Sequence, residues 1–165
     1  MSNEQCCFAT KPQSNGDDCC IVQPKGKTQC PICGEEAKGV LAKTLDALLT
    51  PKAKDRLDSL EGFYYCKTST CRAIYFRGIE VLNQNDLSVS VGLKADAKVK
   101  NYCYCFGWTK EKMKEDIKQN GTSSAIADIQ SKMKSLGCSC EVKNPSGKCC
   151  QVDVKKALKE ILDED

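Results

Sequence analysis

The chain has 165 residues, enough for one ordinary domain or two small ones, and only 41% are apolar and 6% aromatic, so its hydrophobic core is small. Its net charge of +3 is spread over mixed-sign segments such as residues 110–118, and this leaves no basic stripe of the kind that binds nucleic acid. With 14 cysteines and no histidine, any transition metal must be held by thiolates, helped at most by carboxylates.

The cysteines are expected to bind metal rather than to form disulfides. The N-terminus has no apolar run that would indicate a secretory signal, and no stretch is long enough to span a bilayer. We therefore expect a cytoplasmic protein without membrane insertion. Clustered cysteines in a reducing cytosol are more often metal ligands than disulfides, and a disulfide-stapled exported protein is the alternative.

Residues 1–28 are polar and almost free of apolar pattern, which predicts a disordered tail. The tail contains two adjacent pairs, Cys6 with Cys7 and Cys19 with Cys20. These are either plain free thiols or an arm for thiol exchange or for transient binding of a soft ion such as Cu(I).

Residues 29–95 are predicted to form a small module of helices and strands. Leucines at helical spacing over 41–49 predict one helix, and Thr50 with Pro51 starts a second that ends near Gly62. Residues 63–65 and 73–76 are predicted strands, and the alternation over 87–91 predicts a further half-buried strand. Residues 94–100 are predicted to be a linker.

Residues 96–165 are predicted to be mainly helical. Thr109 is the expected N-cap of a helix that runs to Gln119 and stops at Gly121. A second helix is capped by Thr122 or Ser123 and closed by Gly137, and a third runs from about 151 to 163. The expected buried positions of these last two helices are Ile126, Ile129, Met133, Val154, Leu158, Ile161 and Leu162. The predicted fold class is therefore α+β, a small α/β module followed by a helical domain.

Four cysteines form Cys-x2-Cys, a long gap and Cys-x4-Cys, namely Cys30, Cys33, Cys66 and Cys71. Two short-spaced pairs supply two edges of the tetrahedron that zinc prefers, and four thiolates leave no open position. We predict a structural zinc site whose binding energy contributes to folding. In the alternatives, only the first pair binds metal, neither pair does, or the cage holds a single iron.

Six further thiols lie at the two ends of a predicted helical hairpin: Cys103, Cys105, Cys138, Cys140, Cys149 and Cys150. Side chains two apart in an extended segment point to the same side, so Cys103 and Cys105 could share one iron. Two adjacent cysteines seldom both ligate one small cluster, because their side chains diverge. We therefore expect one ligand from the pair Cys138 and Cys140 and one from the pair Cys149 and Cys150. The spacing fits either a 2Fe-2S cluster or a second zinc site.

The segment Cys-Tyr-Cys-Phe-Gly-Trp-Thr-Lys-Glu at 103–111, with the long gap before the later thiols, resembles the bacterioferritin-associated ferredoxin (Bfd-like) 2Fe-2S domain. Four motifs in one order resemble the N-terminal region of CopZ-type copper chaperones. They are Cys-Pro-Ile-Cys-Gly at 30–34, Phe-Tyr-Tyr-Cys-x4-Cys-Arg-Ala-Ile-Tyr-Phe at 63–76, Cys-Tyr-Cys-Phe-Gly at 103–107 and Cys-Glu-Val-Lys-Asn-Pro-Ser-Gly-Lys-Cys-Cys at 140–150.

This resemblance covers about residues 28–165 and implies zinc within 30–71 and a 2Fe-2S cluster within 103–150. The ligand set that we then prefer for the cluster is Cys103, Cys105, Cys140 and Cys149, with Cys138 and Cys150 as alternates. CopZ-type proteins of this kind also carry a domain with a Met-x-Cys-x2-Cys copper motif, and that motif does not occur in this sequence. Copper chaperoning by that motif is therefore not expected of it.

The expected function is that of a cytoplasmic redox protein with structural zinc and one 2Fe-2S cluster, linked to copper homeostasis. Its expected partner is a redox protein or a copper-transport protein. The alternative is a non-redox interaction or regulatory module with zinc in both sites. Catalysis beyond electron transfer is not expected, because the sequence has no histidine, no Gly-rich phosphate loop and no nucleophile motif.

Overall fold

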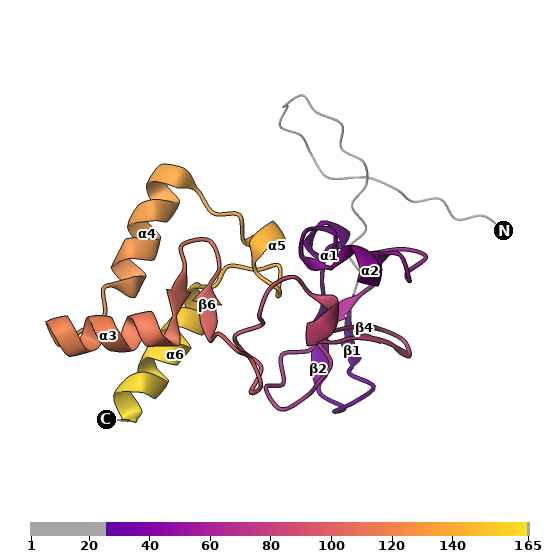
Figure 1. Ribbon diagram of the computed structural model, residues 1–165, viewed down its shortest axis with the longest axis horizontal. Helices are drawn as coiled ribbons and strands as arrows, with labels where there is room; N and C mark the ends of the chain where they lie inside the picture. Colours follow the sequence, from indigo (N-terminus) through magenta and orange to yellow (C-terminus); the bar gives the residue numbers. More distant parts are fainter. Residues whose placement is uncertain (1–25, 165) are drawn as a thin grey trace.

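The computed structural model describes residues 26–164, which form a β-sheet module followed by a helical region (Figure 1). This arrangement confirms the predicted α+β class. The four tail cysteines, Cys6, Cys7, Cys19 and Cys20, lie outside the described residues. The first strand begins at Lys27, so the tail predicted over residues 1–28 includes the first two residues of this strand. Among the described residues, no helix has the length and apolar character needed to cross a membrane.

Five short strands form one antiparallel sheet in the order β1-β2-β3-β4-β5. Their bounds are β1 Lys27–Gln29, β2 Glu36–Gly39, β3 Tyr64–Tyr65, β4 Tyr75–Arg77 and β5 Glu80–Leu82. The sequence predicted β3 and β4 but missed the other three. These have three or four residues each, and β1 and β2 are mostly exposed, so neither shows the apolar alternation that marks a strand.

The connection from β2 to β3 contains α1, Ala42–Leu48, and α2, Pro51–Lys54. As predicted, the Thr50 side chain caps α2, accepting a hydrogen bond of 3.2 Å from the Ala53 N–H. The helix is only four residues long, however, and the prediction that it reaches Gly62 was wrong. The Arg77 guanidinium donates to the backbone carbonyls of Ser59 and Glu61 at 3.2 Å, and these contacts hold residues 58–62 as a loop.

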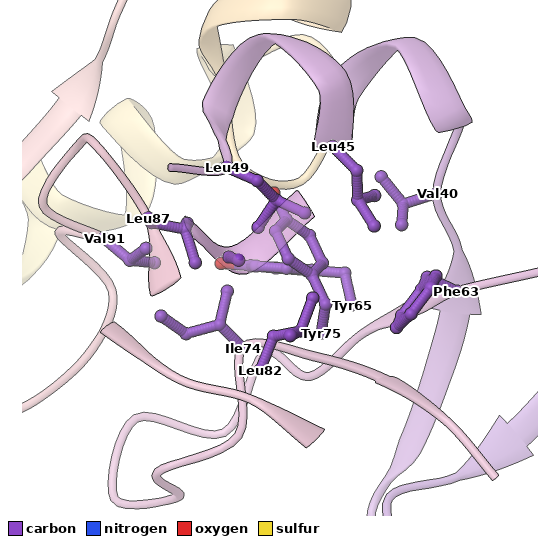
Figure 2. Packing of buried hydrophobic residues seen from close by; sticks show 11 residues of the cluster. Val40, Leu45, Leu49, Phe63, Tyr65, Ile74, Tyr75, Leu82, Leu87 and Val91 are labelled. Carbon is purple, nitrogen blue, oxygen red and sulfur yellow. The ribbon is translucent and has the colours of Figure 1, made fainter. Parts of the chain in front are cut away.

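The core of the module lies between α1 and the face of the sheet formed by β3, β4 and β5 (Figure 2). It consists of Val40, Leu45, Leu49, Ala53, Phe63, Tyr65, Ile74, Tyr75, Leu82, Leu87 and Val91. Burial of these side chains is the main hydrophobic stabilisation of the module. The leucine spacing of 41–49 therefore identified the buried face of α1 correctly.

The strand predicted over 87–91 does not form. Instead, a short 3₁₀ helix, η1 Gln84–Asp86, precedes a single bridge between Leu49 and Leu87. The Gln84 side-chain amide donates to the Val89 carbonyl at 2.7 Å and accepts from the Val91 N–H at 3.0 Å. The Gln84 side chain thus forms hydrogen bonds that a neighbouring strand would otherwise form with residues 89 and 91. Leu87 and Val91 are still buried, as their alternation indicated.

The helical region begins with a hairpin of two strands, β6 Asn101–Cys103 and β7 Trp108–Thr109. The helices that follow are α3 Lys110–Asn120, α4 Ala125–Leu136, α5 Cys140–Lys143 and α6 Gln151–Asp163. Thr109 caps α3 as predicted, and Gly121 (φ +75°) and Gly137 (φ +71°) end α3 and α4 in conformations that suit glycine.

The buried face of α6 is formed by Val154, Ala157 and Ile161. Leu162 was expected on this face but is 57% exposed. One helical residue beyond Ile161 corresponds to a rotation of about 100° around the axis, which takes Leu162 to the solvent side.

Candidate metal centres

The four cysteines of the sheet module converge into one cage. All four Sγ atoms lie within 4.8 Å of one another. The Sγ atoms of Cys30 and Cys71 are 3.9 Å apart, and those of Cys33 and Cys66 are 3.7 Å apart. Sulfurs bound tetrahedrally to zinc at about 2.3 Å are about 3.8 Å from each other. The cage therefore has the dimensions of a four-thiolate zinc site.

Two backbone turns deliver these thiols. The first carries Cys30 and Cys33 between β1 and β2, and it is closed by a hydrogen bond of 2.8 Å from the Gly34 N–H to the Cys30 carbonyl. Gly34 adopts a positive φ of +75°, which suits glycine best. The second turn follows β3, where the Cys71 N–H donates to the Thr68 carbonyl at 3.2 Å. Each cysteine pair is thus ordered locally before the metal joins the two.

The four thiols differ in acidity. Burial alone would raise the pKa of Cys33, but hydrogen bonds with the Thr68 hydroxyl and the Glu35 backbone outweigh it and lower the pKa to about 6. Burial raises the pKa of Cys71 to about 12 and also raises the pKa of Cys66. A bound zinc ion displaces the remaining protons, so zinc binding to this cage releases protons.

Lys94 lies beneath this cage and is 2% exposed. Its ammonium donates to the carbonyls of Cys66 and Thr68, each at 2.9 Å, and of Ala73 at 2.6 Å. Burial lowers the pKa of Lys94, whereas the neighbouring thiols act to raise it. A buried cation is suited to a zinc ion with four thiolates, whose net charge is negative.

The expectation that residues 94–100 form a linker is therefore wrong at its first residue. Nothing in the sequence marks Lys94 as buried, because lysine is almost always exposed and no apolar period includes it. The burial of Lys94 is explained only by the fold, in which the carbonyl groups of the second cysteine turn point toward its ammonium group.

Replacing Lys94 by methionine should weaken zinc binding. Three carbonyls would lose a charged donor, and unsatisfied buried acceptors together with lost charge-assisted hydrogen bonds cost about 3 kcal/mol. We expect faster zinc release to a chelator and a lower unfolding temperature of the zinc-loaded protein. Lys98→Met, an exposed lysine of the same segment, is the control. Equal zinc release from both variants and the wild type would show that Lys94 does not support the cage.

The six later cysteines fall into three classes of exposure. Cys103, Cys140 and Cys150 are buried, Cys105 is half-buried, and Cys138 and Cys149 are exposed. Cys103 ends β6, Cys140 begins α5 and Cys150 directly precedes α6. The exposed thiols of Cys138 and Cys149 both line a surface hollow of about 590 Å³, next to Cys140.

The buried and half-buried thiols form two close pairs. The Sγ atoms of Cys105 and Cys140 are 3.6 Å apart. Cys103 and Cys150 are buried in the same cluster, where interaction with the Cys150 thiol lowers the pKa of Cys103 to about 7, and Cys103 together with burial raises the pKa of Cys150. Within residues 26–164, no three of the later cysteines bring their ligand atoms within 4.8 Å of one another. This arrangement differs from the single cage of the sheet module.

A signal for Cys150 was present in the sequence but was not used. Val154, Ala157 and Ile161 form the buried face of α6, and Cys150 lies four residues before Val154 on the same helical spacing. Extending the apolar period backwards by one turn would have favoured Cys150 over Cys149 as the inward-facing thiol.

Comparison with known proteins gives a consistent result. Residues 27–88 match the CopZ-type family model described as a zinc binding domain. The chain is 31% identical over 122 residues to a protein of Archaeoglobus fulgidus named copper chaperone CopZ, covering 74% of this chain. That match spans 57% of the length of the relative. The chain is also similar to the X-ray structure of the A. fulgidus CopZ N-terminal domain, with a TM-score of 0.66 and 28% identity over 78% of this chain and 96% of that one.

Residues 27–88 are therefore a zinc-binding domain of the CopZ type, and their four-cysteine cage is the site where zinc fits. The similarity to the A. fulgidus protein extends beyond this segment into the helical region.

Proposed function

We propose that this chain is a cytoplasmic electron-transfer protein, with structural zinc in the sheet module and a 2Fe-2S cluster in the helical region. The observation that carries the proposal is the arrangement of the later thiols: Cys105 lies 3.6 Å from Cys140, Cys103 and Cys150 are buried in the same cluster, and within residues 26–164 no three of the later thiols form a single cage. A single zinc ion requires four sulfurs in one tetrahedron, each about 3.8 Å from the others. Two neighbouring irons require two thiolates each, which is what two separate pairs supply.

The ligands that we propose for the cluster are Cys103, Cys105, Cys140 and Cys150. Three of these belong to the set preferred from the sequence. Cys150 is chosen over Cys149 because it is buried in the same cluster as Cys103, whereas Cys149 is exposed. The pairs also differ from the sequence-based expectation that Cys103 and Cys105 share one iron, since Cys105 lies against Cys140.

When bound, such a cluster supplies a one-electron redox centre. The protein contributes a largely buried setting for it and a hydrogen bond of 3.4 Å from the Ser139 N–H to the Cys105 sulfur. Hydrogen bonds to ligand sulfurs and exposure to solvent both tune the reduction potential. Cys105 is the half-buried member of the set, so we propose that a redox partner approaches the protein at this thiol.

We also propose that the electron transfer serves copper homeostasis, with a copper-transport protein as a partner. This part is supported by the similarity to a protein named as a copper chaperone. A one-electron donor keeps copper as Cu(I), the form that thiolates prefer. Cys6, Cys7, Cys19 and Cys20 are proposed as transient Cu(I) contacts, so replacing all four by serine should abolish Cu(I) binding, and an unchanged affinity would reject this role.

Anaerobic purification followed by reduction tests the electron-transfer proposal. We expect a brown protein with charge-transfer absorption that bleaches on one-electron reduction, together with an electron paramagnetic resonance signal of the reduced cluster. A colourless protein that stays silent after reduction would instead support the non-redox module with zinc in both sites.

A further inference from the structure

The sheet module contacts the first thiol segment of the helical region through Tyr104. This residue lies between Cys103 and Cys105. Its side chain extends from the β6–β7 hairpin to the loop at residues 90–92, which precedes the hairpin in sequence. The hydroxyl accepts a hydrogen bond of 2.9 Å from the Gly92 N–H and donates one of 3.0 Å to the Ser90 carbonyl. One side chain therefore fixes the backbone between two proposed cluster ligands.

The loop that contains Gly92 and strand β6 pack closely against each other. Gly92 is buried, and a Cβ added to it would lie 2.0 Å from the carbonyl oxygen of Asn101 and 2.5 Å from its backbone nitrogen. Any other residue at this position would push β6 away from the loop. The Tyr104 contact is thus part of a packed junction rather than a lone surface bond.

The loop that receives Tyr104 is itself anchored to the zinc cage. The Lys94 N–H donates to the Val91 carbonyl at 2.9 Å, and the Lys94 ammonium binds the carbonyls of Cys66 and Thr68. The Ala95 N–H donates to the Ser69 carbonyl at 2.9 Å. A continuous series of contacts therefore joins the second zinc-ligand turn to the Cys103–Cys105 segment.

A second set of contacts holds the other thiol segment. The Tyr75 hydroxyl, fully buried in the sheet module, donates to the Pro145 carbonyl at 2.6 Å. The Thr44 hydroxyl donates to the Glu141 carbonyl at 2.5 Å, and Lys43 forms an ion pair with Glu141. These contacts place α5 beside α1, at the junction of the two parts in Figure 1. The loop between Cys140 and Cys150 is thereby fixed at two points.

We propose that the zinc-binding module is a clamp that positions both thiol segments of the second centre, and that Tyr104 is the positioning residue of the Cys-x-Cys segment. This inference rests on the proposed function, since it concerns the same four ligands. The two segments are far apart in sequence, and ordering them before the metal arrives removes part of the entropy that cluster binding would otherwise cost. Zinc loading and retention of the cluster should therefore be coupled.

The test compares Tyr104→Phe with Tyr102→Phe in the full chain. Both changes remove one hydroxyl next to Cys103, but the two hydrogen bonds to the loop at residues 90–92 are made by the Tyr104 hydroxyl. The measurements are the rate of iron release to a chelator, the electron paramagnetic resonance spectrum of the reduced protein, and zinc per chain.

For Tyr104→Phe we expect iron release at least about tenfold faster, because both hydrogen bonds of the hydroxyl are lost, with broader resonance lines and an unchanged zinc content. Tyr102→Phe should match the wild type. Three identical proteins would overturn the clamp, and so would a Tyr104→Phe effect that appears only together with loss of zinc. A colourless wild type would reject the proposed function separately. The clamp would then be tested by zinc release from the later thiols, which should be faster in Tyr104→Phe than in Tyr102→Phe or the wild type.

Discussion

Replacing Cys71 by serine is expected to remove zinc from the sheet module and to abolish its cooperative unfolding transition. Apparent binding free energies of structural zinc sites are about 10–16 kcal/mol, as large as the whole stability of a typical domain. Apart from the thiols, the hydrophobic cluster at the cage has only Ala37, Ala73 and Phe76 as buried members within residues 26–164, with Tyr64 and Val81 partly buried, so hydrophobic packing cannot replace the metal at this end of the sheet. Zinc analysis and circular dichroism during heating measure both effects.

The control for this change is Cys138→Ser, which removes an exposed thiol outside the cage. It should retain one zinc in the sheet module and unfold as the wild type does. A Cys71→Ser protein that keeps zinc and an unchanged unfolding transition would show that the other three thiols suffice and that the metal does not stabilise the fold.

Replacing Cys150 by serine is expected to remove nearly all iron, whereas replacing Cys149 should leave the iron content close to that of the wild type. The two residues are adjacent, so each variant is the matched control of the other. Cys150 is buried in the same cluster as Cys103, and with the proposed ligand set its loss would leave one iron with a single thiolate from this pair. Cys149 is exposed at the rim of the surface hollow.

Iron and sulfide per chain and the visible spectrum of anaerobically purified variants measure the difference. Loss of iron from Cys149→Ser with retention in Cys150→Ser would support the ligand set preferred from the sequence. Equal retention in both would place the fourth ligand elsewhere, with Cys138 as the remaining candidate.

Features that depend on local chemistry were predicted correctly from the sequence. The Cys-x2-Cys and Cys-x4-Cys turns of the zinc cage, the Thr50 and Thr109 caps and the glycine stops at Gly121 and Gly137 each depend on a few neighbouring residues. Such short-range requirements are visible in sequence because one residue type is strongly favoured at one position.

Features that depend on distant partners were missed. Lys94 is buried because three carbonyls of another turn meet it, and residues 87–91 are not a strand because Gln84 occupies their hydrogen-bonding groups. Neither partner can be identified from propensity or periodicity alone. The contacts of Tyr104 with Ser90 and Gly92 belong to the same class, since they join two parts of the chain that the sequence pattern treats as separate.

The most direct test of two distinct metal centres is the metal content of the wild-type chain purified without oxygen. We expect one zinc, two irons and two acid-labile sulfides per chain, with the zinc lost in Cys71→Ser and the iron lost in Cys150→Ser. Two zinc ions per chain with neither iron nor sulfide would contradict it.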